Sequence, residues 1–236
     1  DTLWTIGKID ALFAKARYSM EMIGSFPSLD KDKPFNIIDA RHPILLKRLG
    51  RDNTVDMSLK IENENVIIIT GPNAGGKTVV LKTVGLLTLM VLSGIHIPAH
   101  PDTNFHYFSE LLVDIGDLQS IEDDLSTFSS HLSNILRILQ RADENSLVLL
   151  DEIGTGTDPT EGSALAMAVL IELRDERAKV LATTHHGNLK MFANELDGFQ
   201  NASMEFDLEK LAPTYRFQQG MPGSSYALEV ASRIGM

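Results

Sequence analysis

The chain has 236 residues, of which 43% are hydrophobic and 22% are charged, a composition typical of a globular domain rather than of a disordered segment. It contains no cysteine, which excludes disulfides, thiolate metal sites, iron–sulfur clusters and cysteine catalysis. The 21 Lys and Arg against 32 Asp and Glu give a formal net charge of -11, so broad electrostatic binding of nucleic acid by this chain alone is not expected.

The first part of the chain combines one long helix with several short strands. Apolar residues at a three-to-four spacing predict an amphipathic helix over residues 3–23, and the stretch 24–34 indicates a loop. β-Like runs then predict three strands, at residues 35–39, 55–61 and 66–70. The pattern turns helical over residues 77–92, and a loop rich in Pro and His follows at 96–106.

Helices and strands alternate in the rest of the chain. Helices are predicted at residues 127–142, 160–174 and 226–234, and strands at 147–150 and 179–183, with two or three more within 199–217. This alternation predicts an α/β domain with a mostly parallel central sheet flanked by helices. No apolar run approaches the 18 or so residues that a membrane span needs.

The sharpest motif is the segment from Gly71 to Thr78, GPNAGGKT, which matches G-x-x-x-x-G-K-[ST] directly after a predicted strand and directly before a predicted helix. Small residues let the backbone N–H groups of such a loop point at phosphates, and the helix N-terminus adds its positive dipole end. Lys77 would reach the β- and γ-phosphates, and the Thr78 hydroxyl would ligate Mg²⁺. The competing interpretation is a chance Gly-rich turn with a surface lysine.

Two adjacent carboxylates, Asp151 and Glu152, follow the apolar run 147–150. A phosphate loop in a hydrolase needs a carboxylate that supports Mg²⁺ and usually a group that handles the attacking water. We therefore expect Asp151 to support the metal through a water and Glu152 to be the general base. The alternative is a strand that ends in two solvated acids.

Two further polar segments, each taken alone, can be explained as purely structural features. Ser126 opens the segment STFSSH at the start of a predicted helix, where it is a natural N-cap. His185 closes the segment Thr183-Thr184-His185 after a buried strand, where a polar side chain can meet a γ-phosphate. A histidine at that place can equally be a satisfied loop residue.

The order of these motifs is that of ABC-type ATPases, but the transporter signature L-S-G-G-Q is absent. The amino-acid sequence resembles the MutS family in four segments: TGPNAGGKT (70–78), STFSSH (126–131), DEIGTGTDPTEG (151–162) and TTHH (183–186). Four more segments look like the second bacterial subfamily of MutS proteins, namely residues 82–90, 115–135, 154–166 and 201–207. The resemblance runs from about Ala14 to Met236.

The resemblance implies a P-loop NTPase of the ABC-ATPase type and assigns roles to individual residues. The implied nucleotide-binding residues are Gly71, Pro72, Asn73, Ala74, Gly75, Gly76, Lys77, Thr78 and Val79. The metal would be held by Thr78 and Asp151, while Glu152 activates water and His185 senses the γ-phosphate. Ser126 would act in trans on the ATP of a second subunit. The adenine would stack on Tyr215 or pack on Val55, since residues 53–55 offer no aromatic ring.

The resemblance also implies an organisation and partners. Residues 1–24 resemble the end of a long lever helix that descends from a clamp, 25–224 an ABC-type ATPase domain, and 225–236 the start of a truncated helix–turn–helix dimerisation element. The cofactors would be ATP or ADP with Mg²⁺. We expect a cytoplasmic homodimer that binds DNA through domains absent from this chain, and no membrane. The second subfamily typically carries a C-terminal nuclease-like Smr domain as well.

The implied function is an ATPase motor, in which ATP binding closes a dimeric clamp on branched DNA and hydrolysis opens it. Stalled ribosomes are an alternative target, and a mismatch-repair MutS is a close relative, although its branch usually carries an Arg where this chain has the turn 154–157. A transporter subunit would need a Gln soon after the phosphate loop and a longer helical insert than the residues between Lys77 and Ser126 provide. A regulatory module without turnover is argued against by Glu152.

Overall fold

The structure is a computed structural model that describes residues 2–116, 124–221 and 223, without the side chains of Asn73 and of residues 124–128. The chain forms two compact units, residues 1–60 with 82–107 and residues 61–81 with 108–236. We call them the first and the second unit. The domain boundaries expected at residues 24 and 224 remain a prediction.

The first unit begins with helix α1 (Thr2–Met22), which confirms the predicted helix. Its apolar residues do not form a buried stripe, however. Leu3, Trp4 and Phe13 are 85%, 69% and 69% exposed, and Met22 is the buried residue of this helix. The C-terminal half of α1 is tied to the first unit by Lys15, whose Nζ donates to the carbonyl of Ser93. The three-to-four spacing therefore identified the helix but not its packing.

The first unit also contains a four-stranded sheet and helix α2 (Pro43–Leu49). The strands are β1 (Ser28–Leu29), β2 (Phe35–Ala40), β3 (Met57–Ile61) and β5 (Asn104–Phe105), in the order β1-β5-β2-β3. Phe35 and Phe105 pack edge to face, with ring centroids 5.2 Å apart. The sequence predicted β2 and β3 but missed β1, β5 and α2, because two to seven residues are too few for a readable period.

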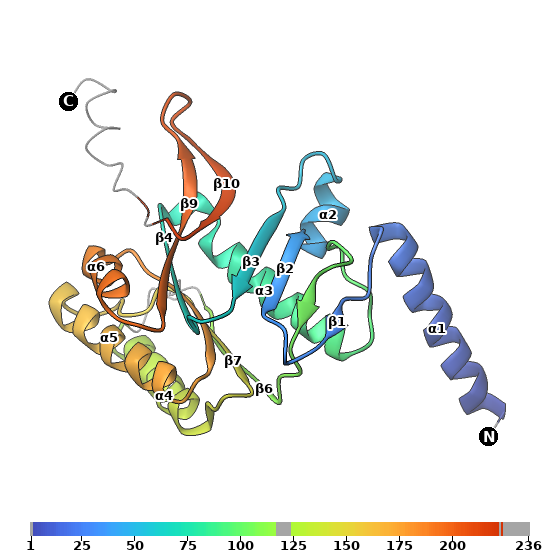
Figure 1. Cartoon of the computed structure of the whole chain (residues 1–236), viewed down its shortest axis with the longest axis horizontal. Coiled ribbons are helices and arrows are strands. Elements are labelled where there is room, and N and C mark those ends of the chain that lie inside the picture. Colours follow the sequence, from blue (N-terminus) through green and yellow to red (C-terminus); the bar gives the residue numbers. More distant parts are fainter. Residues whose placement is uncertain (1, 117–123, 222, 224–236) are drawn as a thin grey trace. The chain divides into compact units, whose positions relative to one another are not determined.

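The second unit is built on a six-stranded sheet in the order β10-β9-β4-β8-β7-β6 (Figure 1). Its strands are β4 (Val66–Thr70), β6 (Glu110–Asp114), β7 (Ser146–Leu150), β8 (Lys179–Thr183), β9 (Phe199–Asp207) and β10 (Ala212–Gln219). All neighbours pair in parallel except the hairpin of β9 and β10. The predicted mostly parallel sheet is therefore confirmed. Both β4 and β7 are buried along their whole length, as central strands of a parallel sheet are.

Three helices cover one face of this sheet: α4 (Asp124–Arg141), α5 (Pro159–Asp175) and α6 (Gly187–Glu195) (Figure 1). The core between them and the sheet includes Ile68, Leu112, Val148, Leu170 and Val180. Helices α4 and α5 were predicted within a few residues, whereas α6 was not predicted. The predicted helix 226–234 lies outside the described residues.

Helix α3 (Lys77–Leu92) has the bounds that the sequence predicted. It follows β4 after the short 3₁₀ turn η1 (Asn73–Gly75). The first turn of α3 belongs to the second unit and the remainder to the first. None of the helices in the described ranges is long and apolar enough to cross a membrane.

Candidate nucleotide-binding site

Three neighbouring parallel strands of the second unit, β4, β8 and β7, end at the same edge of the sheet. Gly71 follows β4, Thr184 follows β8 and Asp151 follows β7. Ile69 is paired with Thr183, and Leu150 with Ala182. The crevice outside the carboxyl ends of parallel strands is where open α/β sheets bind ligands. The fold therefore brings the three motifs that the sequence singled out to one place.

The loop between β4 and α3 is shaped by glycines whose side-chain positions are already filled. Gly71 and Gly76 have φ of 140° and 95°, values that favour glycine over other residues. A Cβ on Gly71 would lie 3.2 Å from the Cβ of Met204, and one on Gly76 would lie 3.3 Å from Cδ1 of Tyr215. The loop thus lies close against β9 and β10, which leaves little room for a side chain at these two positions.

Lys77 is the buried cation of this site, with only 1% of its surface exposed. Its Nζ donates to the carbonyl of Gly71 at 2.7 Å, across the mouth of the loop. Burial lowers the pKa of the Lys77 ammonium, and the charges of Glu152 and Asp151 oppose that shift. An ammonium group that is bonded to a loop carbonyl and feels the charge of two carboxylates is suited to an anionic ligand, which would replace part of the lost hydration.

The two carboxylates after β7 are held differently. Oδ1 of Asp151 accepts a hydrogen bond from the Thr183 hydroxyl at 2.5 Å, and its backbone N–H donates to the carbonyl of Asp114 at 2.8 Å. Glu152 has φ of 50°, a left-handed conformation that is uncommon for a non-glycine residue. Its backbone N–H donates to the Thr183 hydroxyl at 2.8 Å, while its carboxylate makes no hydrogen bond to any other residue within the described ranges. Both side chains are partly exposed.

Two histidines follow β8. The rings of His185 and His186 lie 4.6 Å apart between centroids at a tilt of 33°. Burial and the neighbouring His186 lower the pKa of His185, and Glu152 opposes that shift. Nε2 of His186 lies 3.2 Å from the carbonyl oxygen of Gly154, in the turn that follows Glu152. His185 is therefore electrostatically coupled to the carboxylate that the sequence assigned as the base.

Tyr215 lies beside the phosphate loop, as its contact distance to Gly76 shows. It has φ of 60°, its side chain is 55% exposed, and it falls where the pairing of β10 with β9 is irregular, between Pro213 and Phe217. A bulge of this kind re-aims a side chain out of the sheet. Its role in stacking on adenine remains a prediction, as does the packing role of Val55, which belongs to the first unit.

Ser126 lies in the first turn of α4, but its side chain is outside those that the structure describes, and the same holds for Asn73. Because α4 begins at Asp124, the prediction that Ser126 is the N-cap of this helix is wrong. The helix extends further toward the acidic segment than the sequence predicted, since aspartates favour the first turn of a helix. The role of Ser126 in trans remains a prediction.

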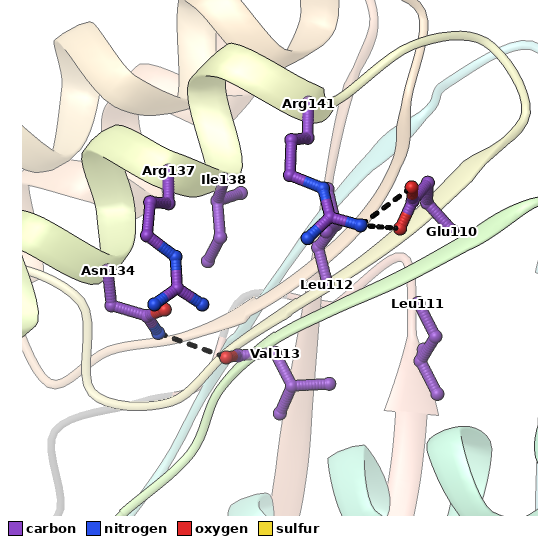
Figure 2. Close-up of a pocket in the computed structure, with 8 residues that line it drawn as sticks. All are labelled: Glu110, Leu111, Leu112, Val113, Asn134, Arg137, Ile138 and Arg141. Carbon is purple, nitrogen blue, oxygen red and sulfur yellow. Dashed lines mark hydrogen bonds and ion pairs between the residues drawn. The ribbon is translucent and has the colours of Figure 1, made fainter.

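Helix α4 is fixed on β6 by contacts that sequence reasoning missed. Asp114 accepts from the Nδ1 of His131 at 2.9 Å and from the Nδ2 of Asn134 at 2.8 Å. Figure 2 shows the other end of the contact between α4 and β6, where one Nη of Arg141 lies 2.8 and 2.7 Å from the two carboxylate oxygens of Glu110. A cavity of about 250 Å³ lies between these contacts. The partners are 17 to 31 positions apart, so no local pattern could have paired them.

The donor set fits a nucleotide with Mg²⁺. Mg²⁺ prefers one or two carboxylates together with phosphate and water oxygens. Asp151 offers Oδ2, which makes no hydrogen bond to another described residue, and Thr78 offers a partly buried hydroxyl in the first turn of α3. Lys77, the loop glycines and the start of α3 supply the positive groups that phosphates require. The residues predicted to hold the nucleotide and the metal therefore fit that chemistry, and their roles remain predictions.

Comparison with known proteins agrees with this arrangement. Residues 67–236 match the family described as MutS domain V, a P-loop ATPase domain. Endonuclease MutS2 of Clostridium novyi (strain NT) is 49% identical over 236 residues, which is 100% of this chain and 29% of that protein. Endonuclease MutS2 of Clostridium botulinum (strain Loch Maree / Type A3) is 49% identical over 232 residues, 98% of this chain and 29% of that protein.

A third relative, Endonuclease MutS2 of Caldanaerobacter subterraneus subsp. tengcongensis, is 50% identical over 232 residues, again 98% of this chain and 29% of that protein. The chain thus spans about 29% of the length of the curated relatives it matches. These relatives agree with the second bacterial subfamily that the sequence resembles. The chain belongs to the MutS family, and its phosphate loop and Asp-Glu strand end lie in the part that matches domain V of that family.

Proposed function

We propose that this chain hydrolyses ATP in a Mg²⁺-dependent reaction. The observation that carries the proposal is the meeting of three strand ends in the second unit. Lys77 lies buried at the end of the phosphate loop, and both carboxylates after β7 act on its pKa. A phosphate loop alone serves binding, whereas a phosphate loop with two carboxylates and a polar residue near the γ-phosphate position serves hydrolysis.

Each residue of the site has a distinct task in this proposal. Lys77 and the loop N–H groups bind the β- and γ-phosphates, and Thr78 with Asp151 holds Mg²⁺, which neutralises charge on the phosphate oxygens when bound. Glu152 accepts the proton of the attacking water. His185, whose pKa is lowered from its ordinary value, is neutral at pH 7 and can form a hydrogen bond with the γ-phosphate.

For the whole protein we propose a motor function in a homodimer. The site of one subunit would be completed by Ser126 of the other, ATP binding would close the dimeric clamp, and hydrolysis would open it. In this proposal residues 1–24 end a lever helix and 225–236 begin a dimerisation element. The relatives are named as endonucleases, so we propose that the whole protein acts on DNA, with branched recombination DNA as the substrate and an Smr domain as the nuclease.

Two substitutions test the ATPase proposal. Removal of a general base typically costs on the order of 10²–10⁴-fold in rate, so Glu152→Gln should bind ATP and scarcely turn it over. Lys77→Ala should lose nucleotide binding. Matched controls are Glu144→Gln and Lys31→Ala, at exposed positions outside the site, which should keep both properties. Turnover by Glu152→Gln at the rate of the unsubstituted protein would overturn the assignment of the base.

A further inference from the structure

We propose that Thr183 is a positioning residue that holds the two carboxylates after β7 in register for ATP hydrolysis. Neither the motif comparison nor the proposed function assigns it a task. Thr183 is the last residue of β8 and is fully buried, at 0% exposure. It is therefore close to the reacting groups without lying at the surface where a nucleotide would bind.

The hydroxyl of Thr183 makes two hydrogen bonds, one to each of the carboxylate-bearing residues. It donates to Oδ1 of Asp151 at 2.5 Å and accepts from the backbone N–H of Glu152 at 2.8 Å. A threonine hydroxyl has a single proton to donate, so Asp151 takes the whole of its donor capacity. This bond fixes the rotation of the Asp151 side chain.

The backbone conformation of Glu152 requires contacts that stabilise it. Its φ of 50° lies in the left-handed region, and a non-glycine residue stays there only when its surroundings determine the conformation. Three contacts from the last residue of β8 and the segment that follows it do so. The Thr183 hydroxyl binds the N–H of Glu152, the Thr183 carbonyl accepts from the N–H of Ile153 at 3.0 Å, and the His186 ring meets the carbonyl of Gly154.

The consequence for chemistry follows from which atoms are engaged. With Oδ1 of Asp151 bound to Thr183, Oδ2 is the oxygen that is left for the metal shell. With the Glu152 backbone held, its carboxylate projects from a fixed point. Groups that orient a metal ligand typically contribute about 10- to 100-fold to activity or metal affinity. Thr183 thus acts through Asp151 and Glu152, and this inference rests on the proposed ATPase function.

Two pairs of variants at this position isolate the hydroxyl. Thr183→Val keeps the branched shape and removes the hydroxyl, while Thr183→Ser keeps the hydroxyl and removes the methyl group. If the valine variant does not fold, the comparison of Thr183→Ser with Thr183→Ala gives the same information in a smaller side chain. The matched control is Thr88→Val, because Thr88 is also fully buried and its hydroxyl donates to the carbonyl of Val84 within α3.

Three quantities are measured: kcat and KM for ATP, the Mg²⁺ concentration that gives half-maximal binding of a fluorescent ATP analogue, and the thermal midpoint. We expect Thr183→Val to lower kcat by about 10- to 100-fold and to raise the Mg²⁺ requirement, with little change in KM. Thr183→Ser should recover most of the rate. Thr88→Val should keep kcat and the Mg²⁺ requirement.

The outcomes separate this inference from the proposed function. Equal kcat and Mg²⁺ requirement in Thr183→Val and the unsubstituted protein would overturn the positioning role and leave the ATPase proposal intact. Equal rates in Thr183→Ser and Thr183→Ala would also overturn it, since the two differ only in the hydroxyl. An unsubstituted protein that neither binds nor hydrolyses ATP would instead refute the proposed function.

Discussion

The backbones of Gly154 and Gly162 touch. A Cβ built on Gly162 would overlap the carbonyl oxygen of Gly154, and a Cβ on Gly154 would lie 2.5 Å from the carbonyl oxygen of Gly162. Gly154 also has φ of 87°. The turn that follows Glu152 is thus packed directly on the first residues of α5, whose N-terminus is capped by the side chain of Asp158.

This contact predicts that Gly162→Ala is destabilising and slows ATP turnover. The obstacle is a backbone carbonyl, which cannot rotate away as a flexible side chain can, so the turn must shift. Overpacking of this kind typically costs about 1–3 kcal/mol in the free energy of unfolding, and a displaced turn moves Glu152. Denaturant unfolding and steady-state kcat would measure both effects.

The control for this prediction is Gly7→Ala in α1. A Cβ on Gly7 would meet nothing within 4 Å, and alanine is a better helix former than glycine. This variant should lose neither stability nor activity. An unchanged unfolding midpoint and an unchanged rate in Gly162→Ala would contradict the packing argument.

Sequence reasoning succeeded where the signal is local. The phosphate loop around Lys77, the strand before it and the helix after it are contiguous in the chain, so spacing alone predicts their order and bounds. The same holds for Asp151 and Glu152 at the end of an apolar run. Parallel pairing then follows from the alternation of strands and helices, and it brings these segments to one sheet edge without any further information.

Sequence reasoning failed where the cause lies in tertiary contacts. The sequence shows Thr183 only as part of a polar segment and does not predict its hydrogen bond to Asp151, because that bond joins residues 32 positions apart. The bonds of Asp114 to His131 and Asn134 are equally non-local. The left-handed φ of Glu152 and of Tyr215 is imposed by the surrounding structure and has no residue signature, unlike that of Gly76. The exposed apolar residues of α1 follow the spacing of a buried face.

Nucleotide-linked dimerisation is a second prediction, and it rests on the proposed composite site. A ligand shifts an equilibrium only through its different affinity for the two states. ATP retained by Glu152→Gln offers a γ-phosphate that Ser126 of a second subunit can contact, whereas ADP does not. Analytical ultracentrifugation of Glu152→Gln should therefore show more dimer with ATP than with ADP.

A second substitution on α4 sharpens the dimer experiment. Adding Ser126→Ala to the Glu152→Gln background should remove the difference between ATP and ADP. Adding Ser133→Ala should not, because the hydroxyl of Ser133 donates to the carbonyl of Ser129 within the same helix. Equal dimer fractions with both nucleotides in Glu152→Gln would speak against the composite site.

The environment of His42 leads us to expect that the free energy of unfolding depends on pH. It precedes α2, and its Nδ1 is buried without a hydrogen-bond partner within the described ranges. Burial, and to a lesser degree the charge of Lys82, lowers the pKa of His42 from 6.5. The unfolded chain then binds the proton more readily than the folded chain. Folded stability is accordingly complete above about pH 6.5 and falls as the pH drops toward the lowered pKa.

Urea unfolding between pH 7 and pH 5 would measure this effect. The fall in the free energy of unfolding should be smaller in His42→Gln, which cannot take up a proton, than in the unsubstituted protein. Lys82→Met should also reduce the fall, because it removes the neighbouring positive charge that disfavours protonation. His185, whose pKa is lowered too, remains in both variants and contributes equally. Identical pH profiles of His42→Gln and the unsubstituted protein would refute the assignment.

The last prediction concerns nucleic acid, and it begins from charge. The net charge is -11, and several of the basic side chains in the described ranges are already paired with acids. These pairs are Lys33 with Asp30, Lys47 with Glu21, Arg141 with Glu110, Arg174 with Asp175, and Lys210 with Asp207. Lys77 is buried in the candidate nucleotide site. The acidic excess of 32 Asp and Glu over 21 Lys and Arg therefore opposes the approach of phosphates.

We accordingly expect the 236-residue chain to bind DNA or RNA weakly on its own. Each phosphate contact needs a Lys or Arg and releases counterions, with a salt slope of about 0.9 per contact on duplex DNA. Because the net charge opposes binding, the dissociation constant should be larger than about 10⁻⁶ M at physiological salt, the tight end of non-specific binding. Fluorescence anisotropy with duplex, branched and single-stranded probes, repeated over a salt series, would measure both the affinity and the slope. Tighter binding with a slope of several contacts would mean that the ATPase part of the protein carries its own nucleic-acid surface.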